Sequence, residues 1–196
     1  MQKLIFATNN LHKLEEIRDL LSDRYDIISL DKIGINEDIP ETADSLEGNA
    51  LQKARFVHKR TGANCFADDT GLEVDALDGA PGVYSARYAS EKATFDDNMD
   101  KLLSSMENKD NRKAKFRTVI ALIIDGNEYL FEGKVDGIIL KSKKGADGFG
   151  YDPIFLPEGF EQSFAEMEAS QKNAISHRGR SVVKLAHFLE GFAGGN

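Results

Sequence analysis

Residues 3–24, KLIFATNNLHKLEEIRDLLSDR, predict a strand, a short polar turn and then a helix. The stretch begins with a short apolar run, KLIFA, which the polar group TNN stops at residues 8–10. Apolar side chains then recur at helical spacing over residues 12–24. The residues on this apolar face are Leu14, Ile17, Leu20 and Leu21. A strand, a turn and a helix in this order are typical of an α/β protein.

The next part of the chain repeats this alternation. Residues 25–30, YDIISL, are expected to form a second strand, and residues 45–62, SLEGNALQKARFVHKRTG, a second helix. Asp44 or Ser45 is expected to cap the start of this helix, and Gly62 to end it. The first third of the chain is therefore predicted to be α/β.

The clearest hairpin lies in the second half of the chain. Residues 115–125, KFRTVIALIID, and residues 128–140, EYLFEGKVDGIIL, are long apolar runs on either side of an Asp-Gly turn. A further strand is expected at residues 64–68, NCFAD, and helices at residues 94–108 and 176–192. Because a hairpin pairs antiparallel strands, we expect a mixed sheet.

The last predicted helix, SHRGRSVVKLAHFLEGF, carries apolar residues that are expected to be mostly core. These residues are Val183, Leu185, Leu189 and Phe192. The chain contains no internal repeat, no low-complexity tract and no linker that separates two domains. We therefore predict a single domain over residues 1–196.

Composition limits the partners. The 196 residues are 41% hydrophobic and 30% charged, which suits a folded core, and 25 Lys and Arg against 33 Asp and Glu give a formal charge of -8. A nucleic-acid partner is therefore not expected. The single cysteine, Cys65, excludes an intrachain disulfide and suits a small core residue better than a catalytic thiol. Neither a signal peptide nor a membrane span is visible, so we expect no membrane partner and a cytoplasmic protein.

Residues 8–13, TNNLHK, lie where the first strand passes into the first helix. Backbone N–H groups and the helix dipole attract an anion at such a point, and Asn9, Asn10, His12 and Lys13 add side-chain donors. A plain capped helix is the alternative. The chain has neither a Walker-type loop nor a dinucleotide fingerprint, so a phosphate site here would have another design.

Residues 67–71, ADDTG, place two carboxylates side by side at the end of an apolar strand. A solvated turn is one interpretation, because Asp and Thr side chains readily bond to the local backbone. The other is a cation site, since Mg²⁺ commonly binds one or two carboxylates together with substrate phosphates. One of these carboxylates would also be placed to orient and deprotonate an attacking water.

Two further stretches are candidates for ligand binding. Residues 148–153, GFGYDP, have two glycines around Phe149, which would let the backbone approach a ligand and the ring face a base. A turn with buried aromatic residues is the alternative. Residues 176–181, SHRGRS, with Lys172 upstream, concentrate donors at the start of the last helix, where a solvated basic helix start is equally open.

Taken together, these motifs resemble the inosine triphosphate pyrophosphatase family of Ham1-type nucleotidases. The resemblance runs from residue 3 to about residue 190 and rests on TNNLHK, GNALQKA, ADDTGLEVDALDGAPGVYSARY, GFGYDPIF and AISHRGRS. It implies an elongated α/β fold, with a long mixed β-sheet flanked by helices and an active-site cleft between two lobes. It also implies a Mg²⁺-dependent homodimer that hydrolyses ITP, dITP and XTP to the monophosphate and pyrophosphate.

The same resemblance implies roles for particular residues. Asp69 takes the position of the general base and metal ligand, and Thr70 that of a substrate contact. The register of IPETAD places Pro40 where some members have a metal-binding Glu, so Glu41 is the substitute ligand. Lys53 and Asp68 are secondary candidates, for the triphosphate and the metal. The other implied substrate contacts are Thr8, Asn9, Asn10, Leu11, His12, Lys13, Phe149, Gly150, Tyr151, Asp152, Lys172, His177 and Arg178.

These roles are chemically consistent with one another. A triphosphate binds an acidic protein only if Mg²⁺ and a local cluster such as Lys13, Lys53 and Lys172 offset the repulsion. Asp69 would position a water for in-line attack at the α-phosphorus. Arg178 would donate to the keto oxygen at position 6 of hypoxanthine or xanthine, whereas the amino group of adenine would face it with a donor. Two alternatives stay open: hydrolysis of modified pyrimidine triphosphates, and nucleotide binding without catalysis.

Overall fold

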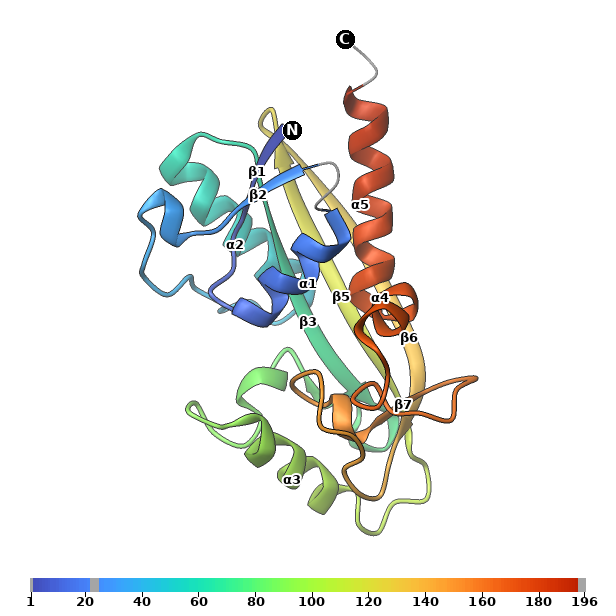
Figure 1. Ribbon diagram of the computed structural model, residues 1–196. Helices are drawn as coiled ribbons and strands as arrows, with labels where there is room; N and C mark the ends of the chain where they lie inside the picture. The colour runs from blue at the N-terminus through green and yellow to red at the C-terminus, as the bar shows by residue number, and fades with distance from the viewer. Residues whose placement is uncertain (1, 22–24, 194–196) are drawn as a thin grey trace. The chain divides into compact units, whose positions relative to one another are not determined.

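The computed structural model describes residues 2–21 and 25–193 (Figure 1). Its strands are β1 (Gln2–Phe6), β2 (Tyr25–Ile28), β3 (Cys65–Val74), β4 (Pro81–Gly82), β5 (Lys113–Ile124), β6 (Asn127–Ile139) and β7 (Phe155–Pro157). Its α-helices are α1 (Leu11–Leu21), α2 (Leu46–Thr61), α3 (Phe95–Ser105), α4 (Ala169–Ile175) and α5 (His177–Ala193). Short 3-10 turns form η1 (Asp31–Ile33), η2 (Asp75–Leu77), η3 (Ser85–Arg87) and η4 (Asp152–Ile154).

The strands of this part of the chain form one mixed sheet in the order β2-β1-β3-β5-β6-β7, with β4 paired to β3. β1 runs parallel to both β2 and β3, whereas β4 is antiparallel to β3 and β7 is antiparallel to β6. The parallel register places Phe6 opposite Phe66. β1 therefore ends beside the first residues of β3, two positions before Asp68. The predicted mixed sheet flanked by helices is confirmed.

The described residues divide into two compact units. The first unit contains residues 2–21, 25–69, 118–133 and 178–193, and the second contains residues 70–117 and 134–177. Each unit has its own apolar core. In the first, side chains of α1 and α5 pack on β1, β3 and β5; in the second, α3 packs with β5, β6 and β7.

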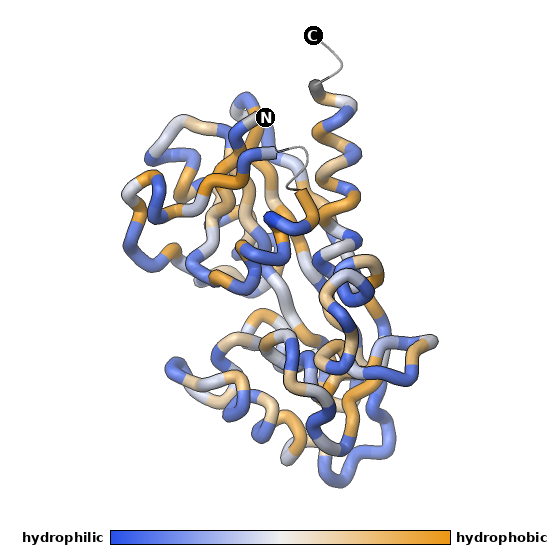
Figure 2. The backbone as a smooth tube through the Cα atoms, viewed as in Figure 1, coloured by the Kyte–Doolittle hydropathy of each residue, from blue (hydrophilic) through white to orange (hydrophobic). Residues whose placement is uncertain are grey.

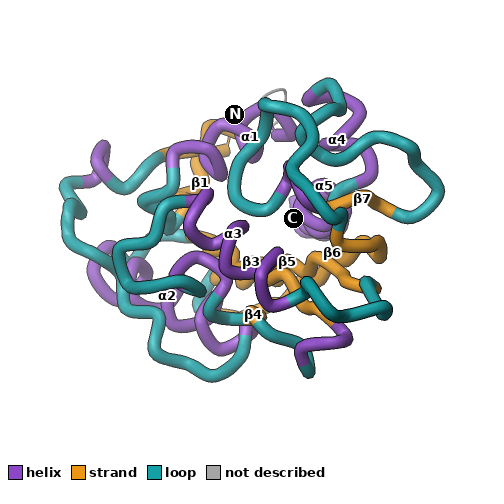
Figure 3. The backbone as a smooth tube through the Cα atoms, turned by 90° about the horizontal axis from the view of Figure 1, so that it is seen from below, coloured by secondary structure: helices purple, strands orange, loops and turns teal. Residues whose placement is uncertain are grey.

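Helices cover both faces of the sheet in the first unit. Phe66 packs in the core that α1 and α5 share, while the neighbouring Cys65 donates its thiol hydrogen to the carbonyl of Ala54 in α2. Successive side chains of a strand point to opposite faces, so α2 lies on the face opposite to α1 and α5. Figures 1 and 3 show this arrangement, and Figure 2 shows hydrophobic and hydrophilic residues alternating along α5.

The structure confirms the predicted helix and turn signals. Ser45 caps α2 by accepting a hydrogen bond from the Gly48 N–H, and Gly62 ends the helix in the left-handed conformation. Thr94 and Asp97 form a capping box at α3. The hairpin turn, residues 125–126, has positive φ at both positions, as the two-residue turn requires. No helix of the described residues is long and apolar enough to cross a membrane.

Three predictions need correction. The strand expected to end at Asp68 continues to Val74, because ion pairs hold the aspartates inside it; the solvated-turn interpretation is therefore wrong. Val183 and Phe192 are exposed, since the buried stripe of α5 runs through Val182, Leu185 and Leu189. The short helix α4 was not predicted. The expected end of the first helix, residues 22–24, lies outside the described residues.

Candidate functional site

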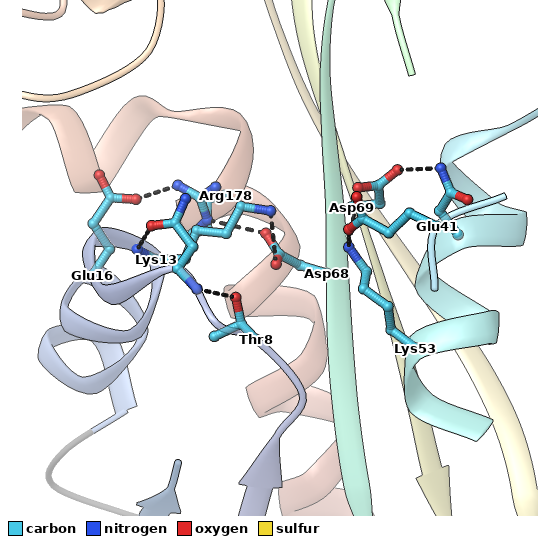
Figure 4. A network of polar contacts seen from close by, with 10 residues as sticks. Thr8, Lys13, Glu16, Glu41, Lys53, Asp68, Asp69 and Arg178 are labelled. Atoms are coloured by element: carbon cyan, nitrogen blue, oxygen red, sulfur yellow. Dashed lines mark hydrogen bonds and ion pairs between the residues drawn. The ribbon is translucent and has the colours of Figure 1, made fainter. Parts of the chain in front are cut away.

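The strand β3 directs two neighbouring carboxylates to opposite sides (Figure 4). Asp68 shares a face with Phe66 and therefore points toward α1 and α5, whereas Asp69 shares a face with Cys65 and points toward α2. Both are buried, with 1% of Asp68 and 7% of Asp69 exposed. Each carboxylate therefore needs its own partners, and each has a separate set.

Asp68 lies in a network of four charged groups. Its Oδ1 is 3.1 Å from Lys13 Nζ, and its Oδ2 is 3.3 Å from Arg178 Nε. Arg178 also forms a close ion pair with Glu16. Burial by itself would raise the pKa of Asp68, but Lys13 and Arg178 outweigh this effect and hold it well below the usual value. Two carboxylates thus balance two cations, and Asp68 stays ionised.

Asp69 has a different environment. Its Oδ1 accepts a hydrogen bond from Lys53 Nζ at 3.1 Å, and its Oδ2 accepts one from Asn49 Nδ2 at 3.1 Å. Lys53 also forms a close ion pair with Glu41. Burial raises the pKa of Asp69, with the nearby Glu41 adding to the rise, although Lys53 and Lys13 oppose it. A carboxylate with a raised pKa accepts a proton more readily, as a general base must.

Glu41 and Asp69 share one ammonium group. Burial would lower the pKa of Lys53, but the Asp69 and Glu41 carboxylates outweigh it and raise the pKa, so the lysine stays charged. Lys53 in turn outweighs the effect of burial on Glu41 and lowers the pKa of that carboxyl. These three groups carry one net negative charge, which favours a further cation nearby.

The polar turn at residues 8–13 lies at the carboxyl end of β1. Thr8 Oγ1 accepts a hydrogen bond from the Asn10 N–H at 3.1 Å, and Asn10 Oδ1 accepts one from the Lys13 N–H at 3.2 Å. Asn9 donates to the carbonyl of Glu37. The capped-helix interpretation therefore holds for Asn10. Leu11 and His12 are exposed at the start of α1, and the Lys13 side chain reaches Asp68.

The second unit holds the other predicted cluster. Asp152 Oδ2 accepts hydrogen bonds from Lys172 Nζ at 2.8 Å and from the Phe149 N–H at 2.9 Å. The same ammonium group lies 4.9 Å from the centre of the Phe149 ring. Gly148 has a φ of 75°, and a Cβ there would lie 2.3 Å from Asp152 Oδ2, so glycine is needed for this approach. Tyr151 is buried and donates its hydroxyl hydrogen to the Ser85 carbonyl.

His177 and Arg178 follow one another but have different surroundings. His177 belongs to the second unit and stacks on Phe116, with ring centres 4.5 Å apart. Arg178 belongs to the first unit and pairs with Asp68 and Glu16. Both are buried, so the start of α5 is not a solvated basic segment.

The predicted residues thus gather in two places. The first unit holds Thr8, Asn9, Asn10, Leu11, His12, Lys13, Glu41, Lys53, Asp68, Asp69 and Arg178. The second holds Thr70, Phe149, Gly150, Tyr151, Asp152, Lys172 and His177. Sequence reasoning missed Asn49 and Glu16 as partners of these groups. The sequence could have indicated Asn49, because it lies four residues before Lys53 and so shares one face of the helix with it. The sequence around Glu16 does not distinguish it from an ordinary surface glutamate of a helix.

The fold and the two ion-pair networks define an α/β protein whose charged groups suit a phosphorylated ligand. The chain belongs to the Ham1 family, whose sequence profile matches residues 4–188. It is 60% identical over 190 residues to the dITP/XTP pyrophosphatase of Porphyromonas gingivalis, covering 96% of this chain and 98% of that one. It is 54% identical over 187 residues to the dITP/XTP pyrophosphatase of Flavobacterium johnsoniae, covering 95% and 97%. The solved HAM1 protein of Coxiella burnetii superposes with a TM-score of 0.90 at 37% identity, covering 97% and 100%.

Proposed function

We propose that this protein hydrolyses noncanonical purine nucleoside triphosphates, namely dITP, ITP and XTP, to the nucleoside monophosphate and pyrophosphate. The two nearly full-length relatives carry the name dITP/XTP pyrophosphatase. The structural observation that carries the proposal is Asp69, a buried carboxylate with a raised pKa that Lys53 and Asn49 hold on one side of β3. It provides a base in a site that also has phosphate-binding cations.

Asp69 would act as the general base. It would take a proton from a water molecule that attacks the α-phosphorus, while the bond from this phosphorus to the bridging oxygen breaks and pyrophosphate leaves. The amide of Asn49 and the ammonium group of Lys53 would keep the carboxylate oriented toward that water. Positioned proton transfer of this kind contributes about 10²–10⁴-fold to a rate.

The donor set of the same site fits Mg²⁺. Glu41 and Asp69 offer hard carboxylate oxygens, and both carboxylates contact Lys53 Nζ, so they lie close to one another. Mg²⁺ commonly binds one or two carboxylates together with substrate phosphates and water. The described residues contain no group of three or more metal-ligating side chains, so the substrate would have to complete the shell. When bound, the ion would neutralise phosphate charge and polarise a phosphoryl oxygen.

Cationic and polar groups of the first unit would bind the triphosphate. The turn at residues 8–13 offers backbone N–H groups at the start of α1, and Lys13 and Lys53 add charge. Burial lowers the pKa of Lys13, and the Asp68 carboxylate offsets only part of that effect. A phosphate that approaches Lys13 would strengthen its protonated state.

Residues of the second unit would recognise the base. The ring of Phe149 would stack on it, Gly150 and Tyr151 would shape its surroundings, and Lys172 would contribute a donor whose direction Asp152 fixes. Thr70 would contact the substrate and His177 would donate to the purine, as would Arg178 of the first unit. A keto oxygen at position 6 accepts such bonds, whereas the amino group of adenine does not; an unmatched buried donor costs about 1–3 kcal/mol.

Three wider features also belong to this proposal. We expect a homodimer and a cytoplasmic location, and we treat residues 1–196 as one domain of the Ham1 type. The family profile spans parts of both compact units, which supports a single functional domain.

A panel of nucleoside triphosphates tests the function. We expect pyrophosphate release from dITP, ITP and XTP at rates far above those for ATP and GTP, and only when Mg²⁺ is present. Faster turnover of methylated UTP would assign the protein to pyrimidine hydrolysis. Tight binding of dITP without any pyrophosphate release would make it a nucleotide-binding protein that is not an enzyme.

A further inference from the structure

Three consecutive residues, 41–43, are bound to one face of α2. Glu41 pairs with Lys53, and the backbone N–H of Thr42 donates to Gln52 Oε1 at 2.9 Å. The backbone N–H of Ala43 donates to Asn49 Oδ1 at 2.9 Å. The contact is tight, since a Cβ at Gly48 would lie 2.6 Å from the Ala43 side chain. The segment that carries Glu41 is therefore held in register along the helix.

Asn49 and Lys53 of α2 each contact both this segment and Asp69, and Asn49 does so with the two different ends of a neutral amide. A backbone N–H is only a donor, so the Ala43 contact requires the carbonyl oxygen of the Asn49 side chain on that side. The NH₂ group must then face Asp69, whose Oδ2 it meets at 3.1 Å. The side chain is 1% exposed, so water does not compete for either bond. The oxygen and the NH₂ group of the Asn49 side chain therefore cannot exchange places.

We propose that Asn49 is a positioning residue, which uses the two ends of its side-chain amide to fix Asp69 and the segment carrying Glu41 in one catalytic geometry. This inference rests on the proposed function. Asn49 and Lys53, four residues apart on α2, hold the two oxygens of Asp69 from the same helix. The helix therefore sets the distance between the base and the second carboxylate, whereas neither the strand nor the 41–43 segment sets it alone.

Three variants separate this role from simple attachment of the segment. Asn49→Ala removes both bonds, while Asn49→Asp keeps an acceptor for the Ala43 N–H and loses the donor to Asp69. The matched control is Gln52→Ala, which releases Thr42 on the same face of α2 and leaves Asp69 untouched. Circular dichroism and thermal unfolding check that each variant is folded.

The readouts are the steady-state kinetics with dITP and the calorimetric affinity for its non-hydrolysable α,β-imido analogue. We expect kcat to fall about 10–100-fold in both Asn49 variants, which is typical when a partner of a catalytic ligand is lost, with analogue affinity within about threefold of wild type. Gln52→Ala should keep kcat within about threefold. A wild-type kcat in Asn49→Asp, a loss in Gln52→Ala as large as in Asn49→Ala, or a parallel loss of analogue affinity would each overturn the proposal.

Failure of this inference is distinguishable from failure of the proposed function. If the wild-type protein releases no pyrophosphate from any purine triphosphate, the function is wrong. If the wild type is active and the Asn49 variants match it, only the role of Asn49 is wrong.

Discussion

Asp68 and Asp69 are adjacent in the chain, yet they point to opposite faces of β3 and take part in different charge networks. The alternation of side chains along a strand causes this separation. Lys13 and Arg178 lower the pKa of Asp68 and keep it ionised, whereas burial raises the pKa of Asp69 beside Asn49 and Lys53. Asp68 thus ties Lys13, at the end of the turn of residues 8–13, to Arg178, whereas Asp69 is the carboxylate that we propose as the base.

The substitution Asp69→Asn is expected to abolish turnover and spare binding. Asparagine keeps the shape of the side chain but accepts no proton, so kcat for dITP should fall about 10²–10⁴-fold. Pyrophosphate release measures this effect, and calorimetry with the α,β-imido analogue measures affinity, which should stay within about tenfold. Turnover at the wild-type rate would contradict the assignment of Asp69 as base.

The substitution Asp68→Asn is expected to act on stability. It leaves Lys13 and Arg178 buried without their shared carboxylate, and breaking a buried ion pair from one side costs about 3–5 kcal/mol of unfolding free energy. Urea unfolding measures the loss. The control is Glu91→Gln, because Glu91 is 88% exposed beside Arg87 and should contribute less than about 1 kcal/mol.

The stability that wild type has over Asp68→Asn should depend on pH in one direction. Since the folded protein lowers the pKa of Asp68 below its ordinary value of 3.8, the stabilisation is complete above that pH. It is lost as pH falls through the folded-state pKa. The gap in stability between wild type and Asp68→Asn should therefore be constant near neutrality and narrow only in strong acid. A gap that narrows between pH 7 and pH 5 would contradict the assignment.

The helix caps and the hairpin turn follow from local patterns, whereas the roles of the site residues were inferred from the family resemblance. The caps at Ser45 and Thr94 and the turn at residues 125–126 are local chemistry, and the structure confirms them. The continuation of β3 through Asp68 was not predictable locally, because its partners Lys13 and Arg178 lie 55 and 110 residues away in the sequence. For the same reason Glu16 was missed: its role depends on Arg178, which lies 162 residues further along.

Cys65 should be unreactive until the first unit opens. Burial raises the pKa of its thiol to about 12, and the side chain is enclosed between β3 and α2. At pH 8 the reaction with a disulfide reagent should therefore be on the order of 10³-fold slower in the native than in the urea-unfolded protein, where the pKa returns to about 8.5. Absorbance of the released thiolate measures both rates. Equal rates would contradict the buried position.

The cluster of Phe149, Asp152 and Lys172 can be tested without changing any of its three side chains. Gly148→Ala would place a Cβ 2.3 Å from Asp152 Oδ2 and push this carboxylate away from Lys172. Gly159→Ala is the matched control, because Gly159 also has a positive φ but nothing within 4 Å of the added Cβ. Both variants should lose about 1–2 kcal/mol of stability from the left-handed backbone, as thermal unfolding would show.

Only Gly148→Ala should raise the KM for dITP, by about tenfold, since the Lys172 donor loses its direction at a cost of about 1–2 kcal/mol. An equal KM in the two variants would show that Asp152 does not position Lys172 for the substrate.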